Sequence, residues 1–483
     1  MMSNDKVFGN FLWRFAERIG AQLVSIIVTI VLARLLAPSA YGTVALITIF
    51  TAILQVFVDS GLGNALIQKK DADEIDFSTV FYTNIALCTV LYILLFIFSP
   101  TIANFYEDVS LTAYIRVLGI TVLISGVKNV QQAYVSKRML FKKFFFSTLG
   151  GTIAAGVIGV IMAVSGFGVW ALIVQQVVNL LIDTLILWMI VKWRPKAVFS
   201  FERLKGLFSY GWKLLVSGLI DTIYANARQL LIGKLYSSSE LAQYNRGEQF
   251  PRLIVVNINT SIDSVLLPTL SSVQDDKKRV KEMTRKSIRV STYIMAPLMM
   301  GIAFCGEPIV ELVLTEKWLP SVFFMRIFCI TYMFYPIHTA NLNAIKALGR
   351  SDIFLTLEIV KKTIGFVTIA FTMFIGIEAM AYSLIFTSVT SQIINSWPNK
   401  KLLDYGYIDQ LKDILLPIAL SVLMGIVIFP IQYLHLNNII VLLIQVVVGG
   451  GLYLLCSKAL KIESFDYLLG IIKSYIEKFD KKG

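Results

Sequence analysis

Charged side chains stand inside long apolar runs of this sequence, where they could bind a charged substrate. Near the start of the chain, Arg14, Glu17 and Arg18 share one helical face, because residues three and four apart are neighbours on a helix. An ionisable residue within a membrane span costs about 2.5–3.5 kcal/mol, so each calls for a reason. Two guanidinium groups with one carboxylate leave net positive charge, and the planar guanidinium suits phosphate oxygens. The alternative is that Arg14 and Arg18 reach lipid headgroups at the membrane boundary.

Two neighbouring runs in the middle of the chain hold a larger polar set. The sequence DTIYANAR places Asp221, Tyr224 and Arg228 on one helical face. Some of these groups could pair with one another, for example Arg252 with Asp221, but so many polar side chains cannot all face lipid. We therefore expect a polar cavity. The residues expected to line it are Asp221, Tyr224, Asn226, Asn245, Glu248, Asn259 and Asp263. The arginines expected to bind a phosphate group of the substrate are Arg14, Arg18, Arg228, Arg246 and Arg252.

Other ionisable groups are candidates for the same cavity. Asp59 ends an apolar run, where helix capping or an ion pair explains it equally well. Lys128 and His338 occupy matching positions in two related segments. An acid such as Asp221 or Glu248 could couple a proton or a sodium ion to transport, as Glu17 could. We expect no other cofactor.

The sequence offers few parts for catalysis. It has no glycine-rich phosphate loop with its lysine, and its two histidines, His338 and His435, adjoin no matching Ser or Cys motif. Asp71 and Asp73 have the spacing of a metal pair in some glycosyltransferases, but they stand in a charged loop without a nucleotide-binding domain. The 4 cysteines lie in apolar runs without metal-ligand spacing. We therefore expect no catalytic residue and no metal site.

The elements that carry these residues are membrane spans. Of the 483 residues 56% are apolar and only 16% are charged, which is typical of a polytopic membrane protein. A span needs about 20 apolar residues, and about fourteen runs meet that length. They lie near residues 10–36, 40–67, 78–104, 110–136, 144–166, 168–192, 208–236, 240–268, 286–314, 321–349, 354–376, 377–398, 412–432 and 437–459. The first run is too long for a cleaved signal peptide, so we expect it to be retained.

The chain repeats itself at a shift of about 200 residues. Residues 13–70 correspond to 212–272, and residues 120–133 to 330–343, which aligns Lys128 with His338. We therefore expect two pseudo-symmetric lobes of about six helices each, followed by two more helices. The expected boundaries are 1–205 for the first lobe, 206–400 for the second with a basic connector at 271–289, 401–459 for the last two helices, and 460–483 for a basic amphipathic tail.

The net charge of +13 lies in short loops rather than on one soluble face, so it indicates membrane orientation and not nucleic acid. Every second loop is basic, which places both termini in the cytoplasm. The connector at 271–289 could lie on the membrane surface, and the tail repeats Phe465, Leu468 and Ile472 at the spacing of an amphipathic helix. A solvated connector explains either segment equally well.

The opening FLWRFAERIGAQLVSIIVTIVLARLLAPSAYG, then VDSGLGNALIQKK, RQLLIGKLYSSSELAQYNRGEQFPRL and SVLLPTL, resemble the Wzx-type polysaccharide flippases of the multidrug/oligosaccharidyl-lipid/polysaccharide exporter superfamily. The resemblance covers essentially the whole chain and is closest to the teichuronic-acid and colanic-acid exporters. One departure is Arg228, where relatives often have an acid.

The resemblance implies an all-α transporter of the kind seen in multidrug exporters and lipid flippases, with alternating access and a cationic cavity. Its substrate would be an undecaprenyl-pyrophosphate-linked oligosaccharide, flipped from the cytoplasmic to the outer leaflet of a bacterial plasma membrane, with membrane lipid and other polysaccharide-assembly proteins as partners. Two alternatives remain. A multidrug exporter should have an acidic or aromatic cavity, and a membrane-embedded glycan transferase or polymerase needs converging catalytic groups.

Overall fold

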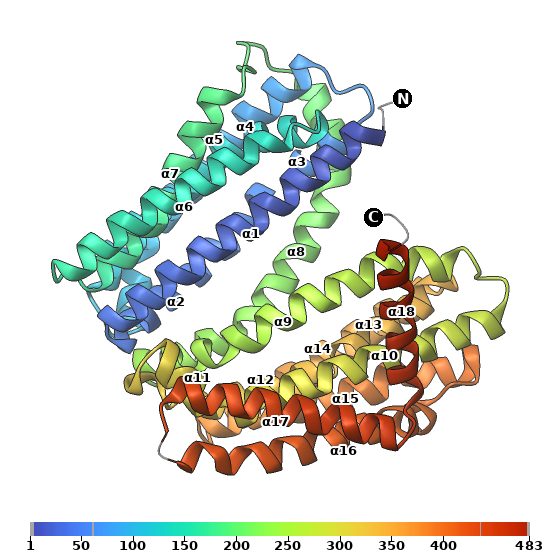
Figure 1. Cartoon of the computed structure of the whole chain (residues 1–483). Coiled ribbons are helices and arrows are strands. Elements are labelled where there is room, and N and C mark those ends of the chain that lie inside the picture. The colour runs from blue at the N-terminus through green and yellow to red at the C-terminus, as the bar shows by residue number, and fades with distance from the viewer. Residues whose placement is uncertain (1–3, 60–61, 435, 481–483) are drawn as a thin grey trace. The chain divides into compact units, whose positions relative to one another are not determined.

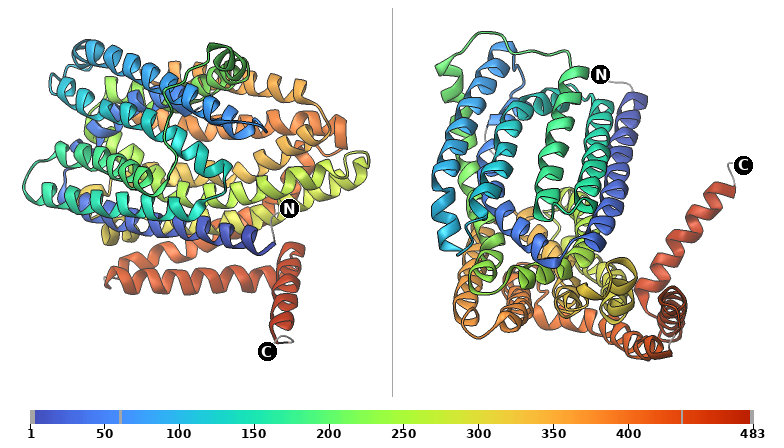
Figure 2. Two further views of the ribbon diagram at one scale, coloured as in Figure 1. Left: turned by 90° about the horizontal axis from the view of Figure 1, so that it is seen from above. Right: turned by 90° about the vertical axis from the view of Figure 1, so that its left-hand side faces the viewer.

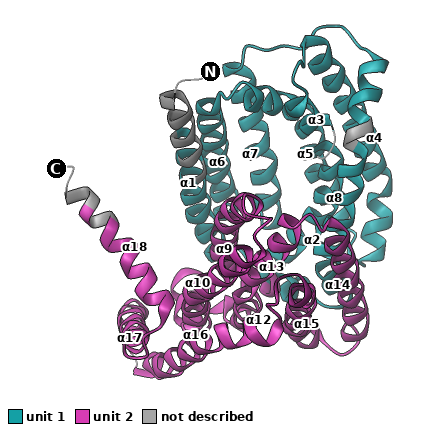
Figure 3. Ribbon diagram, turned by 90° about the vertical axis from the view of Figure 1, so that its right-hand side faces the viewer, with its two compact units in different colours: residues 1–242 teal, residues 243–483 magenta. Residues whose placement is uncertain are grey.

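The computed structural model describes residues 4–59, 62–434 and 436–480, without the side chains of residues 4–12, 14, 15, 18, 209–211, 475, 476 and 478–480. In these ranges the chain consists of helices and short connections, and no strand is assigned there (Figure 1). The chain divides into two compact units, residues 1–242 and 243–483 (Figure 3).

Unit 1 contains the first eight helices. They are α1 (Asn4–Leu35), α2 (Pro38–Asp59), α3 (Leu62–Gln68), α4 (Glu74–Phe105), α5 (Leu111–Lys137), α6 (Phe141–Val164), α7 (Val169–Ile190) and α8 (Phe201–Leu235). Within the unit α6 packs against α1 and α7, and α5 packs against α2, α4 and α7. A hydrophobic cluster that includes Phe77, Phe81, Val130 and Trp193 joins the ends of α3, α4, α5 and α7.

Unit 2 begins within α9 (Ser238–Ser271). It continues with α10 (Lys277–Phe304), α11 (Gly306–Val313), the short helix η1 (Glu316–Trp318), α12 (Ser321–Met333), α13 (Tyr335–Ala347), α14 (Ser351–Thr372), α15 (Ile377–Leu403), α16 (Tyr407–Ile428), η2 (Phe429–Leu434), α17 (Asn438–Ala459) and α18 (Glu463–Asp480). The long α10 is central, because it contacts α12, α13 and α16.

The expected all-α membrane fold is confirmed. In the described residues eleven helical segments are long and apolar enough to cross a membrane. The other three expected spans correspond to α1, α8 and α14. The described part of α1 contains a shorter apolar helix, Ile19–Leu35, and α14 holds a Lys361–Glu358 ion pair at 2.6 Å. An ion pair of this kind within a span is suited to face protein or water rather than lipid.

Two expected elements differ in detail. The connector expected at 271–289 is not a separate segment, because residues 277–289 form the first turns of α10 and continue without a break to Phe304. The span expected at 321–349 divides into α12 and α13 at Phe334. Pro336 explains this break, since proline lacks an amide hydrogen and its ring clashes with the carbonyl group four residues earlier.

Candidate functional site

Arg246 of α9 is a buried cation within a membrane span. Its side chain is only 7% exposed, its guanidinium group donates to the amide oxygen of Gln249, and it lies 5.1 Å from the centre of the Trp318 ring. The next residue, Gly247, is a close-packing position, because a Cβ there would lie 2.6 Å from Phe324 Cβ. The first half of α9 is therefore pressed against α12, and Arg246 is fixed within it.

Arg252 lies farther along α9 and is held differently. Its Nη1 lies 3.5 Å from Glu248 Oε1, and the hydroxyl group of Tyr332 donates to the same oxygen at 2.6 Å. The Arg252 side chain is 64% exposed, whereas that of Glu248 is 16% exposed. Tyr332 thus orients Glu248, and Glu248 tethers a guanidinium group that stays open to its surroundings. Such a group can donate hydrogen bonds to phosphate oxygens from its remaining N–H groups.

The second half of α9 is joined to α13 by two polar contacts. Thr339 donates to Asn259 at 2.7 Å, and Asn343 donates to the carboxylate of Asp263 at 2.9 Å. The two contacts are four residues apart on each helix, so they lie about one helical turn apart. Asn343 is buried, while Asp263 remains exposed.

Three amide side chains, which the sequence interpretation did not single out, form a network beside this contact. The Asn341 oxygen accepts from Asn399 at 2.7 Å and from Gln410 at 2.8 Å, and all three side chains are fully buried. His338, which was singled out, lies 3.3 Å from Asn395 through its Nδ1 atom. His338 therefore has an amide partner on α15.

Unit 1 holds a second polar centre inside its span region. Lys128 of α5 forms an ion pair with Asp183 of α7 at 2.5 Å, and both side chains are largely buried. Asp59, the last residue of α2, accepts from Gln55 at 3.0 Å and from Asn129 at 3.4 Å. The sequence interpretation named Lys128 and Asp59 but missed Asp183, although Asp183 stands in the equally apolar run NLLIDTLIL.

The α8 residues expected in the cavity differ in exposure. Arg228 is 8% exposed, whereas Asp221 is exposed. Tyr224 and Asn226 are half-buried, and the Asn226 amide donates to the carbonyl group of Thr222 at 2.8 Å. Asn245, at the start of unit 2 on α9, is also half-buried.

The α1 group is described only in part. Glu17 is buried, and the hydroxyl group of Thr148 on α6 donates to its carboxylate at 3.5 Å. Lys142, also on α6, lies 5.1 Å from the centre of the Trp13 ring. The side chains of Arg14 and Arg18 lie outside the described residues, so their phosphate-binding role remains an expectation.

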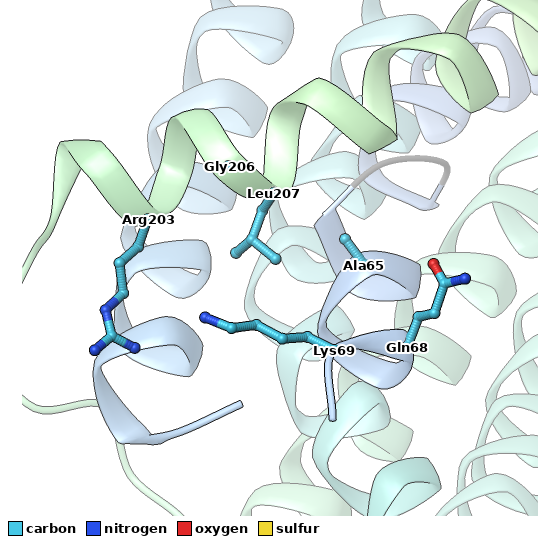
Figure 4. Close-up of a pocket in the computed structure, with 6 residues that line it drawn as sticks. All are labelled: Ala65, Gln68, Lys69, Arg203, Gly206 and Leu207. Atoms are coloured by element: carbon cyan, nitrogen blue, oxygen red, sulfur yellow. The ribbon is translucent and has the colours of Figure 1, made fainter. Parts of the chain in front are cut away.

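A cavity of about 450 Å³ opens in unit 1 where α3 ends beside the start of α8 (Figure 4). Lys69 and Arg203, which extend toward one another there, both bind the fully buried carboxylate of Asp76, at 2.7 and 3.1 Å. The Asp76 amide and Arg203 also bind Asp73 and lower the pKa of its carboxyl group. The two cations are thus matched by two acids, and we interpret the cavity as a structural clamp of α3, α4 and α8.

The chain matches the family model described as polysaccharide biosynthesis protein over residues 31–323, more than half of its length. It is 25% identical over 386 residues to the teichuronic acid biosynthesis protein TuaB of Bacillus subtilis (strain 168), with 79% of this chain and 80% of that protein covered.

Two solved structures share the fold. The inward closed conformation of the lipid II flippase MurJ aligns with a TM-score of 0.72 at 15% identity, covering 93% of this chain and 98% of that chain. An inward-facing multidrug resistance MATE family transporter of the MOP superfamily aligns with a TM-score of 0.61 at 15% identity, covering 80% and 94%. At these identities the structures establish the fold alone, and the fold class that the sequence predicted is confirmed. The family model goes further: this chain belongs to the polysaccharide biosynthesis protein family.

Proposed function

We propose that this protein is a flippase for polyprenyl-pyrophosphate-linked oligosaccharides in a bacterial inner membrane. It would move the undecaprenyl-linked repeat unit of a surface polysaccharide from the cytoplasmic to the outer leaflet. Membership of the polysaccharide biosynthesis family, the similarity to a teichuronic acid biosynthesis protein and the fold of a lipid II flippase all support this proposal.

The physical task is to carry a charged pyrophosphate and several sugars across about 30 Å of hydrocarbon. No bond needs to form or break. The protein must replace the water around the headgroup with polar side chains, while the polyprenyl tail can stay in lipid. An arginine-rich path is suited to this task, because each guanidinium group offers paired donors to phosphate oxygens.

The observation that carries the proposal is the exposed, tethered guanidinium group of Arg252 on a membrane span. It is 64% exposed and is held from one side by Glu248. A lipid-facing charge at this place would be costly, so the group is suited to a polar passage that an anionic headgroup enters. A multidrug exporter for cations would gain nothing from it.

We assign the other candidates by the surroundings of each side chain. Arg228 and Arg246 are buried and would raise the positive potential near the passage, as Arg14 and Arg18 would from α1. Asn226, Asn245, Asn259 and Tyr224 would meet sugar hydroxyl groups. The acids Glu17, Asp59, Asp221, Glu248 and Asp263, with Lys128 and His338, would line the polar region or couple an ion to the cycle.

The two compact units would be the moving parts of alternating access, exposing the passage to each side in turn. We propose that the repeat divides the chain into two lobes of about six helices with two helices appended. No reaction in this cycle requires a catalytic residue or a metal, so we propose a transporter rather than an enzyme.

The test is flipping of a fluorescent undecaprenyl-pyrophosphoryl oligosaccharide in proteoliposomes by wild type, Arg252→Ala and Arg252→Lys. A hydrogen bond to a charged group contributes about 1.5–3 kcal/mol, so we expect Arg252→Ala to slow flipping about ten-fold or more. Arg252→Lys should be intermediate, because lysine keeps the charge but lacks the paired donors.

The matched control is Arg350→Ala, since Arg350 is also exposed but pairs with Asp352 between α13 and α14. This control should flip at the wild-type rate. Equal rates for Arg252→Ala and Arg350→Ala would remove Arg252 from the passage. Failure of well-folded wild type to flip several different glycans would contradict the function itself.

A further inference from the structure

The last helix, α18, leaves the bundle of unit 2. Three residues separate it from α17, and one of them, Lys461, has φ of 50°, a turn conformation. Its contacts are with α10 and α17. Figure 1 shows α18 running across the end of α17 rather than along it, and both views of Figure 2 show its later turns apart from the other helices of the unit.

The first turns of α18 are fastened to α10 by charged groups. Arg289 forms an ion pair with Glu463, and the Lys286 ammonium group lies 3.7 Å from the centre of the Tyr467 ring. Ile462 and Ser464 are buried beside these contacts. One end of the helix is thus fixed to unit 2, and its direction is set there.

The later turns carry an apolar stripe. Phe465, Leu468, Leu469 and Ile472 follow one another at three- and four-residue spacing, which places them on one side of a helix. Phe465 and Leu468 are half-buried, whereas Leu469 is 36% and Ile472 is 54% exposed, so the protein leaves the far end of the stripe uncovered. Ser474 is also exposed but lies about 200° around the helix from Ile472, on the polar side.

Two neighbouring elements place α18 at the level of a membrane surface. The membrane span α17 ends at Ala459, immediately before the connection to α18. The basic residues of α10 end at Arg289, and the apolar part of that helix follows. Because hydrocarbon excludes such charges, the boundary lies close to Arg289, the residue that holds Glu463.

We propose that α18 lies in the lipid–water interface of the leaflet where α17 ends, with the exposed end of the stripe, Leu469 and Ile472, among the upper acyl chains. The tail 460–483 holds five basic and four acidic residues, so its net charge is only +1. Attraction to anionic lipid therefore cannot be the driving force, and burial of the apolar stripe is. α18 is a surface anchor that ties α10 to the membrane plane.

The test uses the full-length protein with its four cysteines replaced by alanine. Single reporters are introduced as Ile472→Cys and Ser474→Cys, labelled with an environment-sensitive fluorophore, in proteoliposomes of phosphatidylcholine with or without phosphatidylglycerol. We expect a blue-shifted emission and quenching by nitroxide-bearing lipid at position 472, and quenching by aqueous iodide at position 474. Both lipid mixtures should give the same result.

A second variant guards against a local effect of the label. With the reporter at Leu469→Cys, the substitution Ile472→Asp should abolish lipid quenching while the protein stays folded. Iodide quenching at both 472 and 474 would overturn the proposal in favour of a solvated helix. Protection of position 472 from both quenchers would overturn it in favour of packing on protein, and a requirement for phosphatidylglycerol would overturn the apolar driving force.

Discussion

Single ionisable side chains inside the spans are stabilised by partners that lie far away in sequence. Lys128 and Asp183 are 55 positions apart and meet at 2.5 Å. Tyr332 reaches Glu248 across 84 positions. A buried ion needs such a partner, because removing it from water costs several kcal/mol. The polar residues that were predicted to line a passage therefore divide into paired groups and a tethered, exposed Arg252.

The Lys128–Asp183 pair gives a prediction about stability. Lys128→Met or Asp183→Leu alone leaves an uncompensated buried charge and should destabilise the protein by about 3–5 kcal/mol. The double variant should recover most of that loss, since an apolar pair replaces the ion pair. Thermal unfolding of the purified proteins in detergent micelles measures this cycle. Single variants as stable as wild type would show that the pair contributes nothing to folding.

The sequence could predict which single residues are unusual but not which ones meet. Lys128 was recognised because a charge in an apolar run is costly, and the same rule applies to Asp183. The same rule could not identify the amide network of Asn341, Asn399 and Gln410. Uncharged amides cost less to bury than charges, and their spacing in the sequence does not reveal a network. Their pairing depends on how α13, α15 and α16 pack.

At the scale of elements, the amide network links three helices of unit 2. Asn341 is its centre: it accepts from Asn399 and Gln410, and its own amide donates to Gln410 at 2.9 Å. In a span region, where lipid offers no replacement partner, hydrogen bonds of this kind hold helices together. A single substitution at the centre leaves two other buried amides without their partner.

We therefore expect Asn341→Leu to destabilise unit 2 by about 2 kcal/mol or more. The matched control is Gln445→Leu on α17, because Gln445 is equally buried but donates one hydrogen bond to the carbonyl group of Ile428. That change should cost about half as much or less. Thermal unfolding in micelles, with hydrogen exchange of α13 and α15, compares them. A larger loss for Gln445→Leu would contradict the central role of Asn341.

The elements themselves were largely predictable. Long apolar runs required helices of span length, and each expected run corresponds to one long helix or to two shorter ones. The divisions were harder to predict. Pro336 follows the break at Phe334, and Pro308 follows the break between α10 and α11 at Cys305, but Pro297 lies inside α10 without dividing it, so proline alone does not identify a division. The basic stretch 277–289 looked like a connector because charge hid its helical periodicity.

At the scale of the molecule, the two units repeat their polar contacts. In unit 1, Lys128 on α5 pairs with Asp183 on α7; in unit 2, His338 on α13 contacts Asn395 on α15. In each unit the aligned residue thus contacts the second helix after its own, α7 from α5 and α15 from α13. The first contact is an ion pair, and the second joins an imidazole to an amide. This correspondence favours the duplication that the sequence indicated.

The repeat and the loop charges together predict the orientation of the whole chain. The turn between α6 and α7 has no basic residue and contains Gly166 and Gly168 at φ of 82° and 55°, whereas the connection after α3 holds Lys69 and Lys70. The positive-inside rule places the first outside the cell and the second inside. In a variant whose native cysteines are replaced by alanine, a membrane-impermeant maleimide should label Phe167→Cys in intact cells but Lys70→Cys only after permeabilisation. A green fluorescent protein fused after Gly483 should fluoresce, as it does in the cytoplasm. Labelling of Lys70→Cys in intact cells would reverse the orientation, and with it the direction of the proposed transport.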